Sequence, residues 1–240
     1  MKRVEIPNRL GVVLSVMLFG IPAVLLWLAT HVLMPRLVAR GWEPLLAWFF
    51  AGGLVLATLL AAALIGAAMA IQDRSLPKLL EHLRVRRITS DEWRLVGLAL
   101  VGITAAVAGI YAVNQLLWPQ LTPQPEFIHF EPLATDQLYL LAIWLPFFAV
   151  NIIGEELWWR GFIQPRQEPV FKANTWIVQG VLHGAFHFSF GPGVLLVLLP
   201  VVFAIPWAVQ RSRNTSVGII IHAGSNGPAF LAINLGLMPG

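Results

Sequence analysis

The chain has 240 residues, of which 58% are hydrophobic and only 12% are charged, and its mean hydropathy is +0.74. These values exclude an ordinary soluble domain and indicate a polytopic membrane protein. The net charge of +4 comes from basic residues spread along the chain. They form no aromatic-interleaved basic patch, so we expect no nucleic acid partner and instead expect contact with the lipid bilayer. The absence of cysteine excludes disulfides, thiolate metal ligands and a cysteine nucleophile.

Seven apolar segments are candidates to cross a hydrocarbon core of about 30 Å. They cover residues 10–34, 45–71, 95–118, 137–160, 174–190, 194–210 and 215–236. The fifth and sixth are short and meet at Gly191-Pro192-Gly193, so the count is about seven, within a range of six to eight. We therefore predict an all-α polytopic integral membrane helical bundle that forms one domain over residues 1–240.

The basic residues predict the orientation of this bundle. With the N-terminus in the cytoplasm, only Arg36 and Arg40 of the 16 Lys and Arg residues fall outside, and the outer loop from Pro119 to Gln137 contains no Lys or Arg. Cytoplasmic loops carry most of the positive charge in membrane proteins. We expect a multi-pass protein of the cell membrane, and the short loops fit a bacterial inner membrane.

The fourth apolar segment contains three formal charges in a stretch of six residues, at Glu155, Glu156 and Arg160. Charges inside a membrane are costly, which favours a functional role. Glu156 and Arg160 are four residues apart and share a helical face, so we expect an ion pair between them. Glu155 is rotated by about 100° and remains free to point into a cavity. We expect the helix to end near Gln164, because Pro165 follows.

Two later segments carry further polar pairs at helical spacing, His183 with His187 and His222 with Asn226. A lone histidine in a membrane segment is more often a packing residue than a catalyst. Polar groups on three helices favour one shared site more strongly than any of them does alone. The presumed depths place this site in the inner half of the bilayer, open towards the cytoplasm.

These residues resemble the motifs of the CPBP family of intramembrane proteases, also called the Abi family, which includes CAAX prenyl endopeptidases and bacteriocin-processing enzymes. The three motifs are Glu-Glu-x-x-x-Arg at Glu155, Glu156 and Arg160, Phe-x-x-x-His at His187, and His-x-x-x-Asn at His222 and Asn226. The second motif departs from the family pattern, because His183 stands where the family has phenylalanine. His183 therefore packs, tunes His187 or takes a role of its own. The resemblance covers a motif-bearing core of about residues 140–235.

The resemblance implies a membrane-embedded endopeptidase. By this resemblance we expect Glu155 to take a proton from water that His187 helps to position, and His222 and Asn226 to donate hydrogen bonds to the oxyanion. Glu156 and Arg160 support the site. The implied substrate is a protein or peptide that is membrane-bound or prenylated.

The resemblance leaves the metal requirement open. The residues Glu155, His187, His222 and Asn226 have the atom types of zinc ligands. The His-Glu-x-x-His arrangement of soluble zinc proteases is absent. Zinc is thus a candidate cofactor, and a metal-free glutamate mechanism is the alternative.

Three other functions compete with the protease. A non-catalytic binding or immunity protein of the same fold would keep the motifs. A transporter or proton relay would also place glutamate and histidine in the membrane, but predicts inverted repeats, which the sequence lacks. A b-type haem protein would use His187 and His222 as axial ligands, but leaves the glutamate and arginine cluster without a use.

Overall fold

The computed structural model describes residues 8–237, and this part of the chain is helical without a strand. The α-helices are α1 (Val12–Leu28), α2 (Met34–Val38), α3 (Pro44–Ala70), α4 (Leu76–His82), α5 (Ser90–Leu117), α6 (Tyr139–Glu156), α7 (Gln164–Phe171), α8 (Thr175–Phe186), α9 (Pro192–Ser212) and α10 (Thr215–Asn234). Two π-helical segments, η1 (Ala29–Leu33) and η3 (Leu157–Ile163), continue α1 and α6, and short 3-10 turns lie at Thr135–Gln137, Lys172–Asn174 and Phe188–Phe190. The predicted all-α fold is confirmed.

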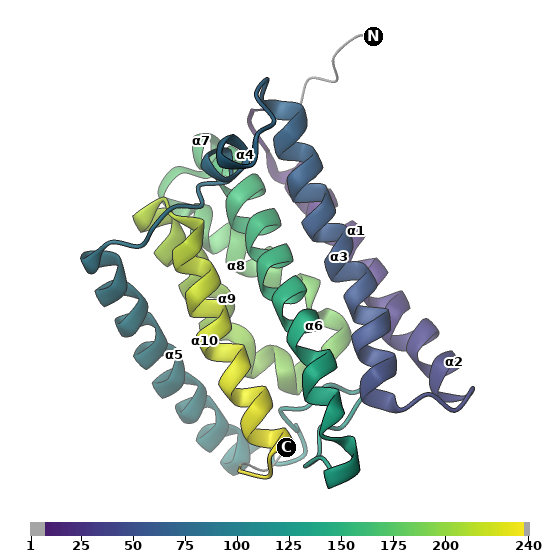
Figure 1. The fold of residues 1–240 in the computed structure, drawn as a ribbon. Helices are drawn as coiled ribbons and strands as arrows, with labels where there is room; N and C mark the ends of the chain where they lie inside the picture. Colours follow the sequence, from purple (N-terminus) through teal and green to yellow (C-terminus); the bar gives the residue numbers. More distant parts are fainter. Residues whose placement is uncertain (1–7, 238–240) are drawn as a thin grey trace.

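Six helical stretches among the described residues are long and apolar enough to cross a membrane. They are Val12–Val38, Pro44–Ala70, Ser90–Leu117, Tyr139–Phe186, Pro192–Ser212 and Thr215–Asn234. The fourth stretch has 48 residues and contains two passages, because the chain reverses at Lys172, where φ is +52°. One passage is α6 with η3, and the returning passage is α8 (Figure 1). The structure therefore has the topology of about seven passages that the sequence predicts.

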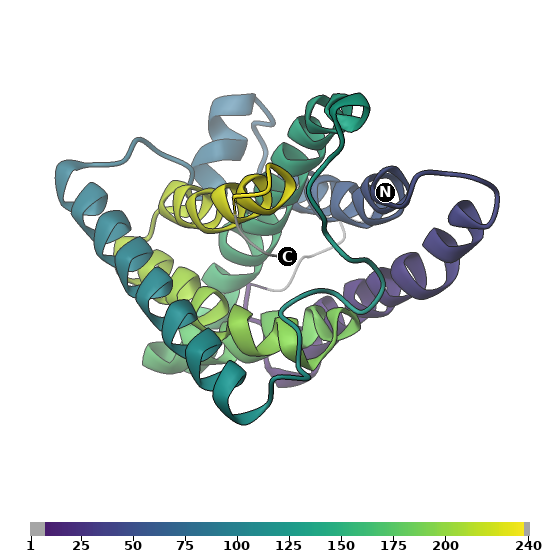
Figure 2. The ribbon, with the colours of Figure 1, turned by 90° about the horizontal axis from the view of Figure 1, so that it is seen from below.

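The helices run side by side between two ends of the bundle (Figure 1). We call one of them the basic end; it consists of residues 8–11, 71–89, 164–174 and 213–214. The helix α6 lies near the middle, against α3 on one side and α10 on the other, while α8 packs against α1 and α9. The helix α5 lies at the edge of the bundle against α9 and α10, as the view along the bundle also shows (Figure 2). Its outward side chains are exposed, including Leu98 at 73% and Leu116 at 81%, as a face towards lipid requires.

Local sequence signals explain most of the helix boundaries. The helix α5 begins with a capping box, in which Thr89 and Glu92 satisfy each other's backbone N–H groups. Gly191 precedes α9 with φ at +89°, a conformation that favours glycine, and Pro192 supplies the first residue of the helix.

The expected helix end before Pro165 is wrong. The helix continues through η3 into α7 and ends at Phe171. Pro165 lies in the first turn of α7, directly after the wide π turn, where a residue without a backbone N–H is tolerated.

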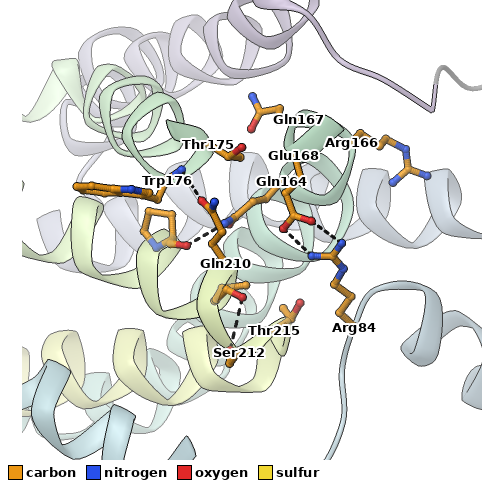
Figure 3. A network of polar contacts seen from close by, with 12 residues as sticks. Arg84, Gln164, Arg166, Gln167, Glu168, Thr175, Trp176, Gln210, Ser212 and Thr215 are labelled. Atoms are coloured by element: carbon orange, nitrogen blue, oxygen red, sulfur yellow. Dashed lines mark hydrogen bonds and ion pairs between the residues drawn. The ribbon is translucent and has the colours of Figure 1, made fainter. Parts of the chain in front are cut away.

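Hydrogen bonds join the loops of the basic end to one another (Figure 3). The Arg84 guanidinium donates two hydrogen bonds to the Glu168 carboxylate, at 2.7 and 2.8 Å, which fastens the loop before α5 to α7. The Thr215 N–H donates to the Arg84 carbonyl at 2.8 Å, so the same loop also holds the start of α10. Lys2 and Arg3, which the charge count includes, lie outside the described residues.

Candidate active site

The first motif lies at the junction between α6 and the π-helix η3. Glu155 and Glu156 are the last residues of α6, and Arg160 lies in the middle of η3. Such wide turns occur often at functional sites. Arg160 Nη1 lies 3.3 Å from Glu156 Oε1, and neither side chain is exposed. This is the ion pair that the sequence predicts, a charge contact rather than an aligned hydrogen bond.

Close packing on α10 holds the Glu156 carboxylate in place. A Cβ atom on Gly218 would lie 2.5 Å from Glu156 Oε2 and 2.9 Å from a Val209 methyl group. Only glycine fits between these groups. Sequence reasoning missed Gly218, although its position one helical turn before His222 is a signal that could have identified it.

His183 joins Glu155 to Arg160. Its Nδ1 lies 2.9 Å from Arg160 Nη2, and its Nε2 lies 2.7 Å from Glu155 Oε2. A guanidinium only donates hydrogen bonds, so Nδ1 of His183 must accept. The ring proton is therefore on Nε2, which donates to the carboxylate. Of the alternatives that the sequence leaves open, this geometry supports a role of its own for His183, and it leaves Glu155 held at one oxygen.

His187 lies at the C-terminal end of α8, one turn beyond His183. Its Nδ1 donates to the His183 carbonyl oxygen at 3.0 Å, because a carbonyl only accepts. Its Nε2 therefore carries a lone pair, and no group within residues 8–237 forms a hydrogen bond with it. A ring nitrogen of His187 lies within 4.8 Å of a Glu155 carboxylate oxygen. His187 and Glu155 thus present two acceptors to one small space.

The third motif reaches the site through Glu156. His222 Nδ1 donates to Glu156 Oε1 at 2.9 Å, and the Asn226 amide donates to His222 Nε2 at 3.1 Å. The rings of His222 and His183 are 6.5 Å apart. With both of its ring nitrogens in hydrogen bonds, His222 is not placed as a haem ligand.

The structure brings all seven predicted site residues together. They form one chain of contacts in the order Asn226, His222, Glu156, Arg160, His183 and Glu155, with His187 next to the last two. Six of the seven are buried, while Asn226 is half-buried. Two apolar hollows lie at the bundle surface, one between α5 and α9 and one between α3 and α6. None of the seven site residues lines either hollow, so neither is the expected polar cavity open to the cytoplasm.

The donor atoms decide whether zinc fits this site. Ligand atoms of Glu155, His183 and His187 lie within 4.8 Å of one another. Zinc requires ligand atoms with free lone pairs about 2.0–2.2 Å from the metal. His183 offers none, because Arg160 occupies Nδ1 and Nε2 carries the proton. In this arrangement only Glu155 and His187 are free donors, so the residues do not fit the three-ligand set of a catalytic zinc.

A helical bundle with six long apolar stretches that encloses two glutamates, an arginine and three histidines defines the class of polytopic membrane proteins with a buried polar site. The comparison with protein families agrees with this class. Residues 137–227 match the model of the type II CAAX prenyl endopeptidase Rce1-like family. The match covers less than half of the chain but includes all three motifs, and it confirms the resemblance seen in the sequence. The general activity that this family implies is a CAAX-type intramembrane endopeptidase. No curated protein and no solved structure matches the chain.

Proposed function

We propose that this protein is an intramembrane endopeptidase that hydrolyses a peptide bond of a membrane-associated or lipidated protein or peptide, with Glu155 as the general base. One observation carries the proposal. The Glu155 carboxylate is buried, is held at Oε2 by a neutral donor, and lies within 4.8 Å of a ring nitrogen of His187. The base is therefore oriented without being neutralised by a direct contact with Arg160.

The spacing between Glu155 and His187 suits one water molecule. A water that donates both of its hydrogens over about 2.8 Å, at a tetrahedral angle, joins acceptors about 4.6 Å apart. One ring nitrogen of His187 and one carboxylate oxygen of Glu155 lie no more than 4.8 Å apart, a separation compatible with such a bridge. Such a water points a lone pair away from both residues, towards a substrate carbonyl.

The chemical steps follow from these roles. The water oxygen forms a bond to the carbonyl carbon while its proton passes to Glu155, and the carbonyl electron pair moves onto the oxygen. Glu155 then returns the proton to the amide nitrogen as the C–N bond breaks. No step requires a metal, which is the metal-free alternative that the sequence leaves open.

The oxyanion needs a hydrogen-bond donor in a fixed position. In the observed pattern His222 Nε2 accepts from Asn226 and has no proton to donate. The Asn226 amide has a second hydrogen, so we assign the donor role to Asn226 and the orienting role to His222. This assignment refines the shared donor role that the family resemblance implies.

The membrane setting supports a lipid-bound substrate. Ile163, the last residue of η3, is eight positions after Glu155, so the site lies roughly 10–12 Å from the basic end. From the excess of positive charge we infer that this end faces the cytoplasm, in a cell membrane such as a bacterial inner membrane. A scissile bond at this depth belongs to a chain that enters the membrane or is anchored by a lipid such as a prenyl group.

A comparison of membrane proteomes tests the activity and identifies the substrate together. Cells that produce Glu155→Gln should accumulate uncleaved precursors that are processed in cells with the wild-type protein. Glu131→Gln is the matched control, since this exposed loop residue has the same chemistry outside the site. Equal processing by the wild-type protein and Glu155→Gln at equal membrane levels would refute the proposed role of Glu155.

A further inference from the structure

His183 has properties that packing does not explain. The ring is only 1% exposed, and both of its nitrogens are paired with ionised groups, Arg160 on one side and Glu155 on the other. A phenylalanine of similar size, the residue that the family motif has at this position, would fill the same space without polar atoms. The histidine therefore adds a defined pair of hydrogen bonds, one accepted and one donated.

We propose that His183 is a positioning residue that separates the general base from the arginine and directs one oxygen of Glu155 towards the water. The ring lies between the guanidinium and the carboxylate, and the Coulomb energy of their attraction is inversely proportional to the distance between them. Arg160 remains paired with Glu156, so the two glutamates acquire different states. Glu156 is neutralised by a cation, and Glu155 is held by a neutral donor.

The consequence for Glu155 is geometric. The hydrogen bond of 2.7 Å holds the carboxylate at Oε2, and in this proposal Oε1 is the oxygen that meets the water. Without the ring, the Arg160 Nη2 group would lose its acceptor, and the Glu155 carboxylate would border the vacated space. A direct ion pair between Arg160 and Glu155 would occupy the base and turn it away from His187.

Two substitutions separate this role from packing. His183→Gln keeps both contacts, because the amide carbonyl accepts from Arg160 and the amide N–H donates to Glu155. His183→Phe keeps a ring and removes both contacts. The role rests on the proposed protease function, so it is measured against Glu155→Gln as the inactive reference.

The kinetic test uses a quenched fluorogenic peptide that ends in a farnesylated Cys-a-a-X sequence, or a precursor found in the proteome comparison. We expect His183→Phe to lower kcat about tenfold or more with little change in KM, and His183→Gln to restore most of the loss. A His183→Phe protein with the kcat of the wild type would overturn the proposal. So would equal losses in the two variants when both show the wild-type unfolding midpoint.

A second measurement needs no substrate. In the ¹⁵N NMR spectrum of the ¹⁵N-histidine-labelled protein in detergent micelles, the signals that disappear in His183→Gln belong to His183. We expect a protonated Nε2 and an unprotonated, hydrogen-bonded Nδ1, and a change at Nδ1 in Arg160→Met. A proton on Nδ1 would overturn the proposed contact whether or not the protein is active. Conversely, full activity of Glu155→Gln would refute the protease mechanism and leave this structural result standing.

Discussion

Arg160→Met tests the charge balance of the site most directly. The substitution keeps an unbranched side chain and removes a guanidinium that is fully buried. It takes away the ion pair of 3.3 Å with Glu156 and the hydrogen bond of 2.9 Å to His183. Glu156 is then left without a cation at a position with no exposure.

The expected loss follows from the cost of an unpaired buried charge. Removing one partner of a buried ion pair destabilises proteins by about 3–5 kcal/mol, and we expect Arg160→Met to fall in this range. Glu156→Gln removes the opposite charge and keeps an acceptor for His222. Because the double variant contains neither charge, its loss should be smaller than the sum of the single losses by about 2 kcal/mol.

The measurement is equilibrium unfolding of the purified protein in mixed micelles with increasing SDS, followed by circular dichroism and tryptophan fluorescence. Arg94→Met is the matched control, because the Arg94 side chain is 81% exposed and should change stability by no more than about 0.5 kcal/mol. If Arg160→Met is as mild as Arg94→Met, or the double variant shows no coupling, Arg160 does not balance Glu156.

Three further predictions concern packing, metal and pH. Gly218→Ala should lower the free energy of unfolding by about 1–3 kcal/mol and reduce cleavage, because the added methyl group displaces the Glu156 carboxylate. The control is Gly97→Ala, which should be harmless because no atom lies within 4 Å of the new Cβ. Similar stabilities for the two variants would contradict this packing. Cleavage should survive chelators such as 1,10-phenanthroline, with less than one zinc per protein by mass spectrometry, and an activity that chelation removes and zinc restores would refute the metal-free mechanism. Burial, and next the Arg166 guanidinium, lower the pKa of His82 from its ordinary value of 6.5, so the unfolded chain takes up the proton more readily than the folded one. Stability should therefore fall as the pH drops below about 6.5. Between pH 7.5 and 5.5 the unfolding midpoint should fall less steeply in His82→Gln than in the wild type, and equal pH slopes would exclude this contribution.

Hydropathy and residue spacing predicted the bundle well because both are local properties. The apolar segments gave the helices and the break at Gly191, and the spacing of four gave the contact between Glu156 and Arg160. The helix end at Pro165 was wrong, because that rule assumes regular α-geometry. The wide turn at Leu157–Ile163 changes the register before the proline is reached.

The partners within the site were harder to predict because they depend on how α6, α8 and α10 pack. Spacing places His183 and His187 on one face, but it does not show that His183 meets both Glu155 and Arg160. The zinc set suggested by the sequence, Glu155, His187, His222 and Asn226, stays a prediction for a related reason. Ligand atoms can be counted in a sequence, whereas the direction of each hydrogen bond, which decides whether a nitrogen has a lone pair, requires the folded neighbours.

The π-helical turn makes this site unusually sensitive to chain length. If one residue of Leu157–Ile163 were deleted, the wide turn could tighten into an ordinary helix. Arg160 is the one motif residue inside this segment, so its position relative to Glu156 would change while the other motif residues stay in the sequence. A residue inserted in the segment would instead rotate all that follows by about 100°, including Gln167, whose amide donates a hydrogen bond to Ser15 of α1 at 2.8 Å. In this segment an insertion should thus be less tolerated than most substitutions, which is the opposite of what a loop would show.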